Sequence, residues 1–345
     1  NDAKATKSSF QLTTDGLYFR HNGEILFSVS NPETEDQDKE NNTLGHINSI
    51  TAIANSNKTE SSIGKFGVGF KAIFAYTNTP LIYSNQYNFS INDLVIPIEI
   101  DKKNYDYPTT MIFPFDNKNK EPQIAYQEIK KGLSSIRDNT LLFLKNINKI
   151  NYEYENNLNQ IMRDEIDNEK VSILNSATKE KTNWLRFKQF LPKSNNLFVS
   201  IAYKLEENIE LKKEQIVPID GEVSIYFPAE KETSKLRFHI HAPFSSTVAR
   251  DSIKDIEENN ILRDLISKLI VESFKYIKEN DYLNFNFLQV LPIKEDNLAI
   301  FYKPILFNII DTFNTKPYIL VEDKTFVPAN MCYRASNKIK KLINE

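Results

Sequence analysis

The sequence predicts an α+β protein of two or three domains. Its 345 residues are enough for that number, because single domains usually hold 100 to 150 residues. The hydrophobic content of 40% and the charged content of 26% are typical of a globular protein with a buried core. Strand-like segments fill the middle of the chain, and a strongly amphipathic helix follows at 260–278.

The first elements read as a β-hairpin and a polar loop. Residues 8–13 and 17–21 alternate in character and flank Asp15-Gly16, a dipeptide typical of two-residue hairpin turns. Residues 31–42 are polar and acidic without periodicity, so a mobile surface loop is expected there.

The remaining elements follow from hydrophobic spacing. Ile47, Ile50 and Ile53, for example, recur at helical intervals. Residues 285–343 mix helix and strand signals without a motif. Helices are expected at 45–55, 67–76, 126–137 and 260–278, and strands at 81–84, 88–91, 109–113, within 141–155, and at 171–174, 184–190, 197–204, 223–227 and 236–241.

Glycine usage points to one place in the chain. Only 8 glycines occur, and Gly64, Gly67 and Gly69 lie within six residues of one another. Glycine lets the backbone approach a ligand closely, and a helix beginning at Gly67 would direct its positive end at a phosphate. Lys65 and Lys71 add charge. The spacing is neither that of a P-loop nor that of a dinucleotide fingerprint. A phosphate-binding loop and a tight structural turn therefore both stay open.

The segment around this loop resembles the second glycine box of the GHKL ATPase class. That class includes the ninety-kilodalton heat-shock chaperone, MutL, type II topoisomerases and histidine kinases, and the segment looks most like the sacsin-related bacterial members. The shared pattern is a glycine-phenylalanine core, a short helix, Thr-x-x-Pro and a strand ending in Ser. The matching residues are Gly64, Phe66, Gly67, Gly69, Phe70, Thr77, Pro80 and Ser84.

Other segments resemble motifs of the class in the same order. Residues 2–6 resemble the end of its first helix motif, and His21-Asn22-Gly23 sits at its turn beside the adenine. Ser56 and Lys58 resemble its lid motif, and Thr109-Thr110 its late threonine near the base. The nucleotide-binding residues that the resemblance implies are Asp2, Asn22, Gly23, Ser56, Lys58, Gly64, Lys65, Phe66, Gly67, Val68, Gly69, Phe70, Lys71 and Thr110.

The resemblance implies a fold and a domain order. Residues 1–150 would form a Bergerat-fold α/β sandwich, with a mostly antiparallel sheet and helices on one face. A transducer-like α/β domain would follow at 151–280, and an α/β extension of unknown role at 281–345. ATP and Mg²⁺ are the implied cofactors. The glutamate that activates water and the asparagine that binds magnesium would lie upstream of Asn1, and the aspartate that reads adenine has no clear match.

One residue of the second domain is a candidate catalytic group. Residues 223–250 resemble the transducer segment whose basic residue reaches the γ-phosphate, and Arg250 is the candidate for that role. The alternative is a surface arginine paired with Asp251 or Asp255, an ion pair that would contribute little to stability. His239 and His241 share one side of a strand without further metal ligands nearby, which favours packing over a metal site.

Composition bears on the cellular compartment and on the kinds of partner that the chain could have. A single cysteine, Cys332, excludes an internal disulfide and favours a reducing, cytoplasmic compartment. The net charge of −3 gives no indication of nucleic acid, and no apolar run approaches the length of a membrane span.

The leading hypothesis is a slow ATP-hydrolysing switch closed by a lid at residues 31–63, with an ATP-controlled homodimer and a chaperone-like or anti-phage defence role as extensions. The alternatives are a degenerate interaction module that does not hydrolyse nucleotide, and a MutL-like DNA-associated ATPase.

Overall fold

The structure is a computed structural model that describes residues 3–41, 43–52, 70–192, 194, 196–210, 212–247, 251–322 and 324–333. The chain divides into two compact units. The first comprises Asn1–Asn183 with Phe190–Leu197, and the second comprises Trp184–Gln189 with Phe198–Glu345. Each unit combines a mostly antiparallel sheet with helices, which confirms the predicted α+β class. The predicted boundaries at residues 150 and 280 stay predictions.

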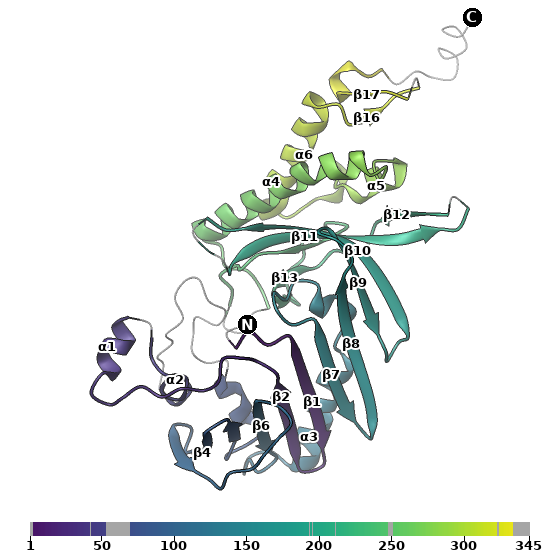
Figure 1. The fold of residues 1–345 in the computed structure, drawn as a ribbon. Coiled ribbons are helices and arrows are strands. Elements are labelled where there is room, and N and C mark those ends of the chain that lie inside the picture. The colour runs from purple at the N-terminus through teal and green to yellow at the C-terminus, as the bar shows by residue number, and fades with distance from the viewer. Residues whose placement is uncertain are drawn as a thin grey trace, which may run out of the picture. The chain divides into compact units, whose positions relative to one another are not determined.

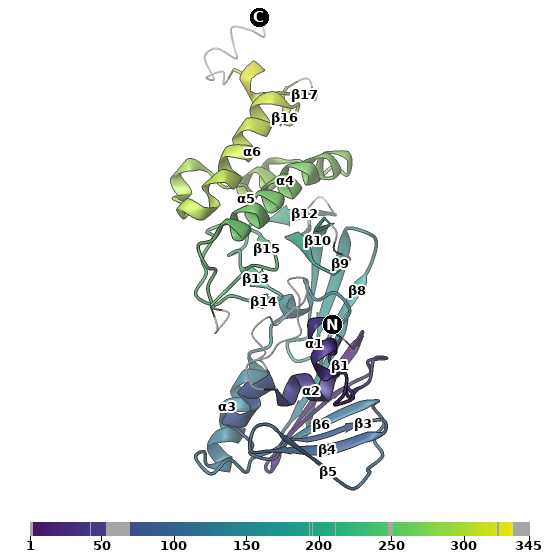
Figure 2. The same cartoon turned by 90° about the vertical axis from the view of Figure 1, so that its left-hand side faces the viewer.

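The first unit is built on a sheet whose strands run in the order β9-β8-β7-β1-β2-β6-β3-β4-β5 (Figure 1 and Figure 2). Neighbouring strands in this order are antiparallel, except that β1 and β7 are parallel. The strands are β1 (Lys7–Thr13), β2 (Gly16–His21), β3 (Leu81–Ser84), β4 (Tyr87–Asn92), β5 (Ile96–Glu99), β6 (Thr109–Pro114), β7 (Lys149–Tyr154), β8 (Asn157–Glu165) and β9 (Lys170–Asn175), while β10 (Glu180–Phe190) contributes to both units.

The predicted hairpin of β1 and β2 is confirmed, with Thr13 opposite Gly16 and Ser8 opposite His21. Glycine is required at the turn. A Cβ at Gly16 would lie 2.6 Å from the carbonyl oxygen of Phe113, on the neighbouring strand β6. The turn therefore lets β2 approach β6 closely as well as reversing the chain.

Helices cover one face of the β6-β3-β4 strands. Ile82, Phe89 and Ile91 of the sheet form a buried cluster with Ile47 of α2. Phe70 and Phe74 pack against the same cluster, and Figure 2 shows α2 and α3 on the same side of these strands. The helices of this unit are α1 (Glu35–Glu40), α2 (His46–Thr51), η1 (Phe70–Ala75), α3 (Pro122–Ser134) and η2 (Asp138–Leu141), of which η1 and η2 are 3₁₀-helices.

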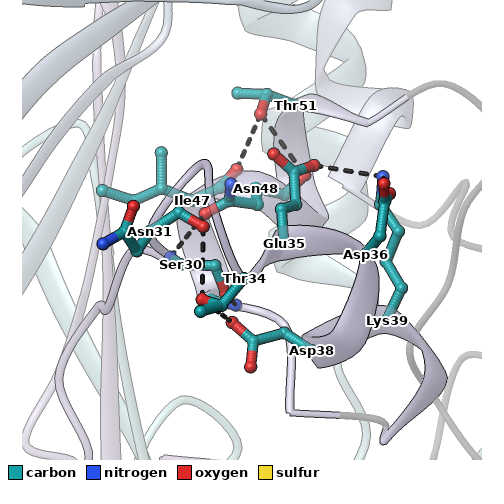
Figure 3. Close-up of polar contacts among 11 residues, drawn as sticks. Ser30, Asn31, Thr34, Glu35, Asp36, Asp38, Lys39, Ile47, Asn48 and Thr51 are labelled. Carbon is teal, nitrogen blue, oxygen red and sulfur yellow. Dashed lines mark hydrogen bonds and ion pairs between the residues drawn. The ribbon is translucent and has the colours of Figure 1, made fainter.

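The segment expected to be a mobile loop at 31–42 contains the short helix α1, and that expectation was wrong. The helix is held by local polar contacts rather than by an apolar face, since none of its residues is buried. Lys39 Nζ lies 3.2 Å from the Glu35 carboxylate and 3.4 Å from that of Asp36 (Figure 3). Hydrophobic periodicity cannot reveal such a helix.

The α1–α2 segment is anchored to the first unit through Ser30. Its backbone N–H donates to Asn48 Oδ1 at 2.9 Å, and its hydroxyl accepts from the Gly45 N–H at 2.8 Å (Figure 3 shows Ser30 and Asn48). A Cβ at Gly45 would lie 2.4 Å from the Ser30 nitrogen, so the two segments touch through their backbones.

The strands of the second unit run in the order β14-β13-β15-β11, and β12 pairs with β11 off this path. The predicted helix at 260–278 is confirmed as α4, which packs on β11 and on α6, and α5 packs on β12. The elements are β11 (Phe198–Asn208), β12 (Lys213–Val217), β13 (Val223–Ile225), β14 (Phe227–Pro228), β15 (His239–His241), α4 (Glu257–Glu279), α5 (Phe285–Val290), η3 (Lys294–Asp296), η4 (Ile300–Tyr302), α6 (Lys303–Thr315), the hairpin of β16 (Ile319–Leu320) and β17 (Phe326–Val327), and η5 (Ala329–Met331).

Candidate functional site

The strands β2, β6 and β3 carry the described part of the predicted nucleotide site. Successive side chains of a strand point to opposite faces, so the register decides which residues share a face. His21 is opposite Thr109, which is opposite Ser84. Arg20, Thr110 and Tyr83 form the adjacent row and therefore point to the other face.

The row of His21, Thr109 and Ser84 lies on the helix-covered face, which we define by Ile82 and Met111. These two residues are opposite each other and lie two positions from Ser84 and Thr109 along their strands. Both belong to the cluster that packs against α2 and η1. The polar row thus lies at the edge of the apolar surface that α2 and η1 cover.

Hydrogen bonds fix two hydroxyls of this row. Ser84 Oγ and Thr109 Oγ1 are 2.9 Å apart, and both residues are buried. The backbone N–H of Phe27 donates to Ser84 Oγ at 3.2 Å. The Ser84 position of the glycine-box pattern therefore links the end of β3 to β6 and to the segment that follows β2.

Asn22 joins the turn His21-Asn22-Gly23 to the start of β1 through both its amide oxygen and its amide nitrogen. Its Oδ1 accepts from the backbone N–H groups of Thr6 and Lys7 at 3.0 and 2.8 Å, and its Nδ2 donates to Thr6 Oγ1 at 2.8 Å. A Cβ at Gly23 would lie 2.6 Å from Ala3. Both residues fix the turn against the start of the chain, and their contact with a nucleotide stays a prediction.

His21 is a neutral hydrogen-bond donor on the helix-covered face. Burial lowers the pKa of its imidazole below the usual range. Its Nδ1 accepts from the Gly23 N–H at 3.1 Å, so the proton of the neutral ring sits on Nε2. The sequence places His21 in the turn that resembles the class, but the predicted nucleotide-binding residues of that turn are Asn22 and Gly23 alone.

Thr110, predicted to bind nucleotide, points away from the helix-covered face. It is fully buried, and its Oγ1 has no hydrogen-bond partner among the residues that the structure describes. Its role stays a prediction, whereas its neighbour Thr109 lies on the helix-covered face, against which η1 packs.

Phe70 and Lys71 begin η1 directly after the glycine loop. Phe70 packs on the apolar cluster with its ring 6.5 Å from that of Phe74. Lys71 Nζ donates to the carbonyl of Leu94 at 2.6 Å, and burial lowers the pKa of the ammonium group. In this structure Lys71 thus binds the turn between β4 and β5.

The Thr-x-x-Pro element after η1 is held by Asp116. The Asp116 carboxylate accepts from Thr77 Oγ1 at 3.0 Å and from the Asn78 N–H at 2.6 Å, and it also binds the Thr79 hydroxyl. Although burial opposes it, these hydrogen bonds lower the pKa of Asp116. Thr77 thus connects the end of η1 to Asp116, which lies just after β6.

In the second unit, the loop that precedes α4 is clamped on both sides of Arg250. Asp251 binds Lys231 at 2.5 Å and accepts from Thr247 Oγ1 at 2.8 Å, and the pKa of its carboxyl is lowered to about 2, first by the Lys231 hydrogen bond. Fully buried Asn259 binds the backbone of Ser245 and Lys254. The loop is thus fixed at 245–247 and 251–254.

His239 and His241 are packed in the second unit, as the sequence favours. The His239 ring lies 5.1 Å from Trp184, and the His241 ring lies 4.8 Å from both Phe198 and Tyr226. Within the described residues, no group of three or more His, Cys, Asp or Glu side chains could hold a metal ion.

Several predicted site residues lie outside the described residues. They are Asp2, Ser56, Lys58, Gly64, Lys65, Phe66, Gly67, Val68, Gly69 and Arg250.

Comparison with known proteins identifies similar folds at low similarity. No protein-family model and no curated protein matches the sequence. The N-terminal domain of a DNA repair protein is similar over 76% of this chain and 86% of its own, with a TM-score of 0.40 and 11% identity. The B-subunit of the DNA gyrase from Myxococcus xanthus is similar over 78% of this chain and 84% of its own, with a TM-score of 0.40 and 8% identity. No helix in the described parts of the chain is long and apolar enough to cross a membrane.

Proposed function

We propose that this chain is the nucleotide-binding part of a GHKL-type ATP switch. The observation that carries the proposal is the convergence of motifs on the helix-covered face. His21, Thr109 and Ser84 end their strands there, and η1, which follows the glycine loop, packs on the same face. These segments are the ones that resemble the motifs of the class, in the order in which the class has them.

The base would bind beside His21 and Thr109. Members of the class use an aspartate near this turn to accept from the adenine amino group. The neutral His21 ring instead offers a donor, Nε2–H, which pairs with an acceptor such as a purine ring nitrogen. The Thr109 hydroxyl, bonded to Ser84, is the second polar group at this end.

The phosphates would bind the backbone N–H groups of the glycine loop, with Lys65 adding charge. Magnesium would neutralise the phosphates through an asparagine that the class carries upstream of the position matched by Asn1. Arg250 would approach the γ-phosphate of bound ATP. The loop at 245–254 would then respond to whether ATP or ADP is bound.

Calorimetric titration of magnesium-ATP and ADP into this chain tests the proposal. Gly67→Asp places a carboxylate where the phosphates would bind, and it should abolish ATP binding. Gly132→Asp is the matched control, since a Cβ at Gly132 in α3 meets nothing within 4 Å.

Unchanged ATP affinity in Gly67→Asp would remove the glycine loop from the site. Binding of ATP without any release of phosphate would instead favour the alternative, a nucleotide-gated interaction module.

A further inference from the structure

A hollow lies on the opposite face of the first unit's sheet, away from the helix-covered face. It has a volume of about 190 Å³ and opens between the β3–β4 hairpin and the segment that precedes β6. Its lining includes Tyr83 and Asn88, which are opposite each other across the hairpin, together with Tyr105 and Tyr107. None of the predicted nucleotide-binding residues lines it, although Ser84, at the end of β3, is part of its rim.

The lining is rich in hydrogen-bond donors and positive charge. Lys102 and Lys103 stand side by side at the hollow and are exposed, and neither has an ion-pair partner among the described residues. No Asp or Glu lines the hollow. Two unpaired ammonium groups beside phenol and amide donors favour an anionic ligand.

The aromatic groups behind the lysines form a preorganised wall. The Tyr83 and Tyr105 rings are 5.0 Å apart, and Lys7 Nζ lies 5.5 Å from the Tyr107 ring. Burial raises the pKa of Tyr83 most, followed by the neighbouring Tyr105 and Tyr18 and by the charge of Asp101 just outside the lining. The Tyr83 phenol therefore stays protonated at neutral pH, and it is hydrogen-bonded to Tyr105.

Arg20 extends the positive charge along the same face. It lies in the row of Thr110 and Tyr83, and its guanidinium stacks 5.0 Å from the Tyr18 ring while donating to Gln11 Oε1 at 2.8 Å. The buried Thr110 hydroxyl, which has no partner in the described chain, lies between Arg20 and Tyr83 in this row.

We propose that this hollow binds a phosphate monoester. Its volume is below the roughly 300–1,000 Å³ of sites for drug-sized ligands, so it suits a phosphate group with a few attached atoms rather than a whole nucleoside triphosphate. A phosphate offers three terminal oxygens to the lysine, phenol and amide donors of the lining, whereas a carboxylate offers two. The partly exposed rings of Tyr105 and Tyr107 lie where the attached carbon skeleton would emerge.

Calorimetric titration with ribose 5-phosphate tests the site. The double variant Lys102→Ala/Lys103→Ala should weaken binding about a hundredfold, because each charge-assisted hydrogen bond contributes about one tenfold step in affinity. Tyr105→Phe, which keeps the ring and removes the donor, should weaken it by a smaller factor. Lys118→Ala is the matched control, since Lys118 is an exposed lysine of the same unit outside the hollow.

Two further measurements separate this site from the nucleotide site and identify the ligand's source. Gly67→Asp should leave ribose 5-phosphate binding unchanged even where it abolishes ATP binding. A 5′-phosphorylated trinucleotide that binds tighter than ribose 5-phosphate would assign a nucleic-acid strand end as the source, and equal affinity would assign the phosphate group alone.

Several results would overturn the proposal. They are no ribose 5-phosphate binding by the wild-type chain, an equal loss of binding in Lys118→Ala, and succinate binding as tightly as the phosphate ester.

Discussion

At the scale of single residues, two neighbouring threonines illustrate what decides a site. Thr109 and Thr110 are both fully buried, yet one hydroxyl is bonded to Ser84 and the other has no partner among the described residues. Their chemistry is identical and their places in the sequence are adjacent. Only the strand register assigns Thr109 to the helix-covered face. The motif could therefore be found from sequence, but the choice between its two hydroxyls could not.

The two threonines give a paired prediction. Thr109→Val removes a hydroxyl from the proposed base end, and we expect ATP affinity to fall about tenfold, the effect of one well-placed hydrogen bond. Thr110→Val replaces a buried hydroxyl without a partner by a methyl group of the same shape, so stability should stay equal or rise and ATP affinity should not change. Calorimetry of both variants measures their ATP affinity, and thermal unfolding measures their stability. The opposite pattern of affinities would place the base on the other face.

At the scale of elements, a helix or strand could be predicted from the sequence when one of its faces is apolar and buried. The β1–β2 hairpin and α4 were predictable because each has one apolar face, which leaves a periodic pattern in the sequence. The strand β5 was not, since all four of its residues are exposed at the edge of the sheet. The helix α1 depends on local ion pairs and was missed for the same reason. The candidate site shows the same limit. The sequence indicates which segments resemble the class, but only the strand register shows to which face the side chains of Thr109 and Thr110 point.

The loop before α4 gives the prediction at this scale. Asn259 donates to the carbonyls of Ser245 and Lys254 at 2.8 and 2.7 Å and accepts from the Ser245 N–H at 2.9 Å. Asn259→Ala leaves these backbone groups without their partner, so we expect a loss of about 2–3 kcal/mol in the free energy of unfolding. Urea unfolding measures it.

The control is Asn260→Ala, because the Asn260 side chain contacts Glu257 and Arg263 on the helix surface. Under the proposed function, Asn259→Ala also slows ATP hydrolysis, since the loop flanks Arg250. Equal stability losses in both variants would show that the clamp contributes nothing of its own.

At the scale of the whole molecule, each compact unit contains an imidazole whose burial opposes protonation. Burial lowers the pKa of His21 in the first unit, and it lowers that of His241 in the second unit to about 3. The unfolded chain binds a proton at each position near the ordinary histidine pKa of about 6.5, whereas the folded chain does not. Folding is therefore most favoured above that pH, and stability falls as the pH drops below it, at up to about 1.4 kcal/mol per pH unit for each such group.

The window from pH 6.5 to 5 isolates the histidines, because the depressed carboxyl pKa of Asp251 affects stability only nearer pH 4 and below. We expect the second unit to lose stability across this window in wild type. His241→Gln should lower stability at pH 8, since it disturbs the contacts with Tyr226 and Ser224, but it should flatten the slope between pH 6.5 and 5. His46→Gln in the first unit controls for replacing a histidine as such. Urea unfolding at several pH values measures the slope, and an unchanged slope in His241→Gln would show that the acid sensitivity of the second unit arises elsewhere.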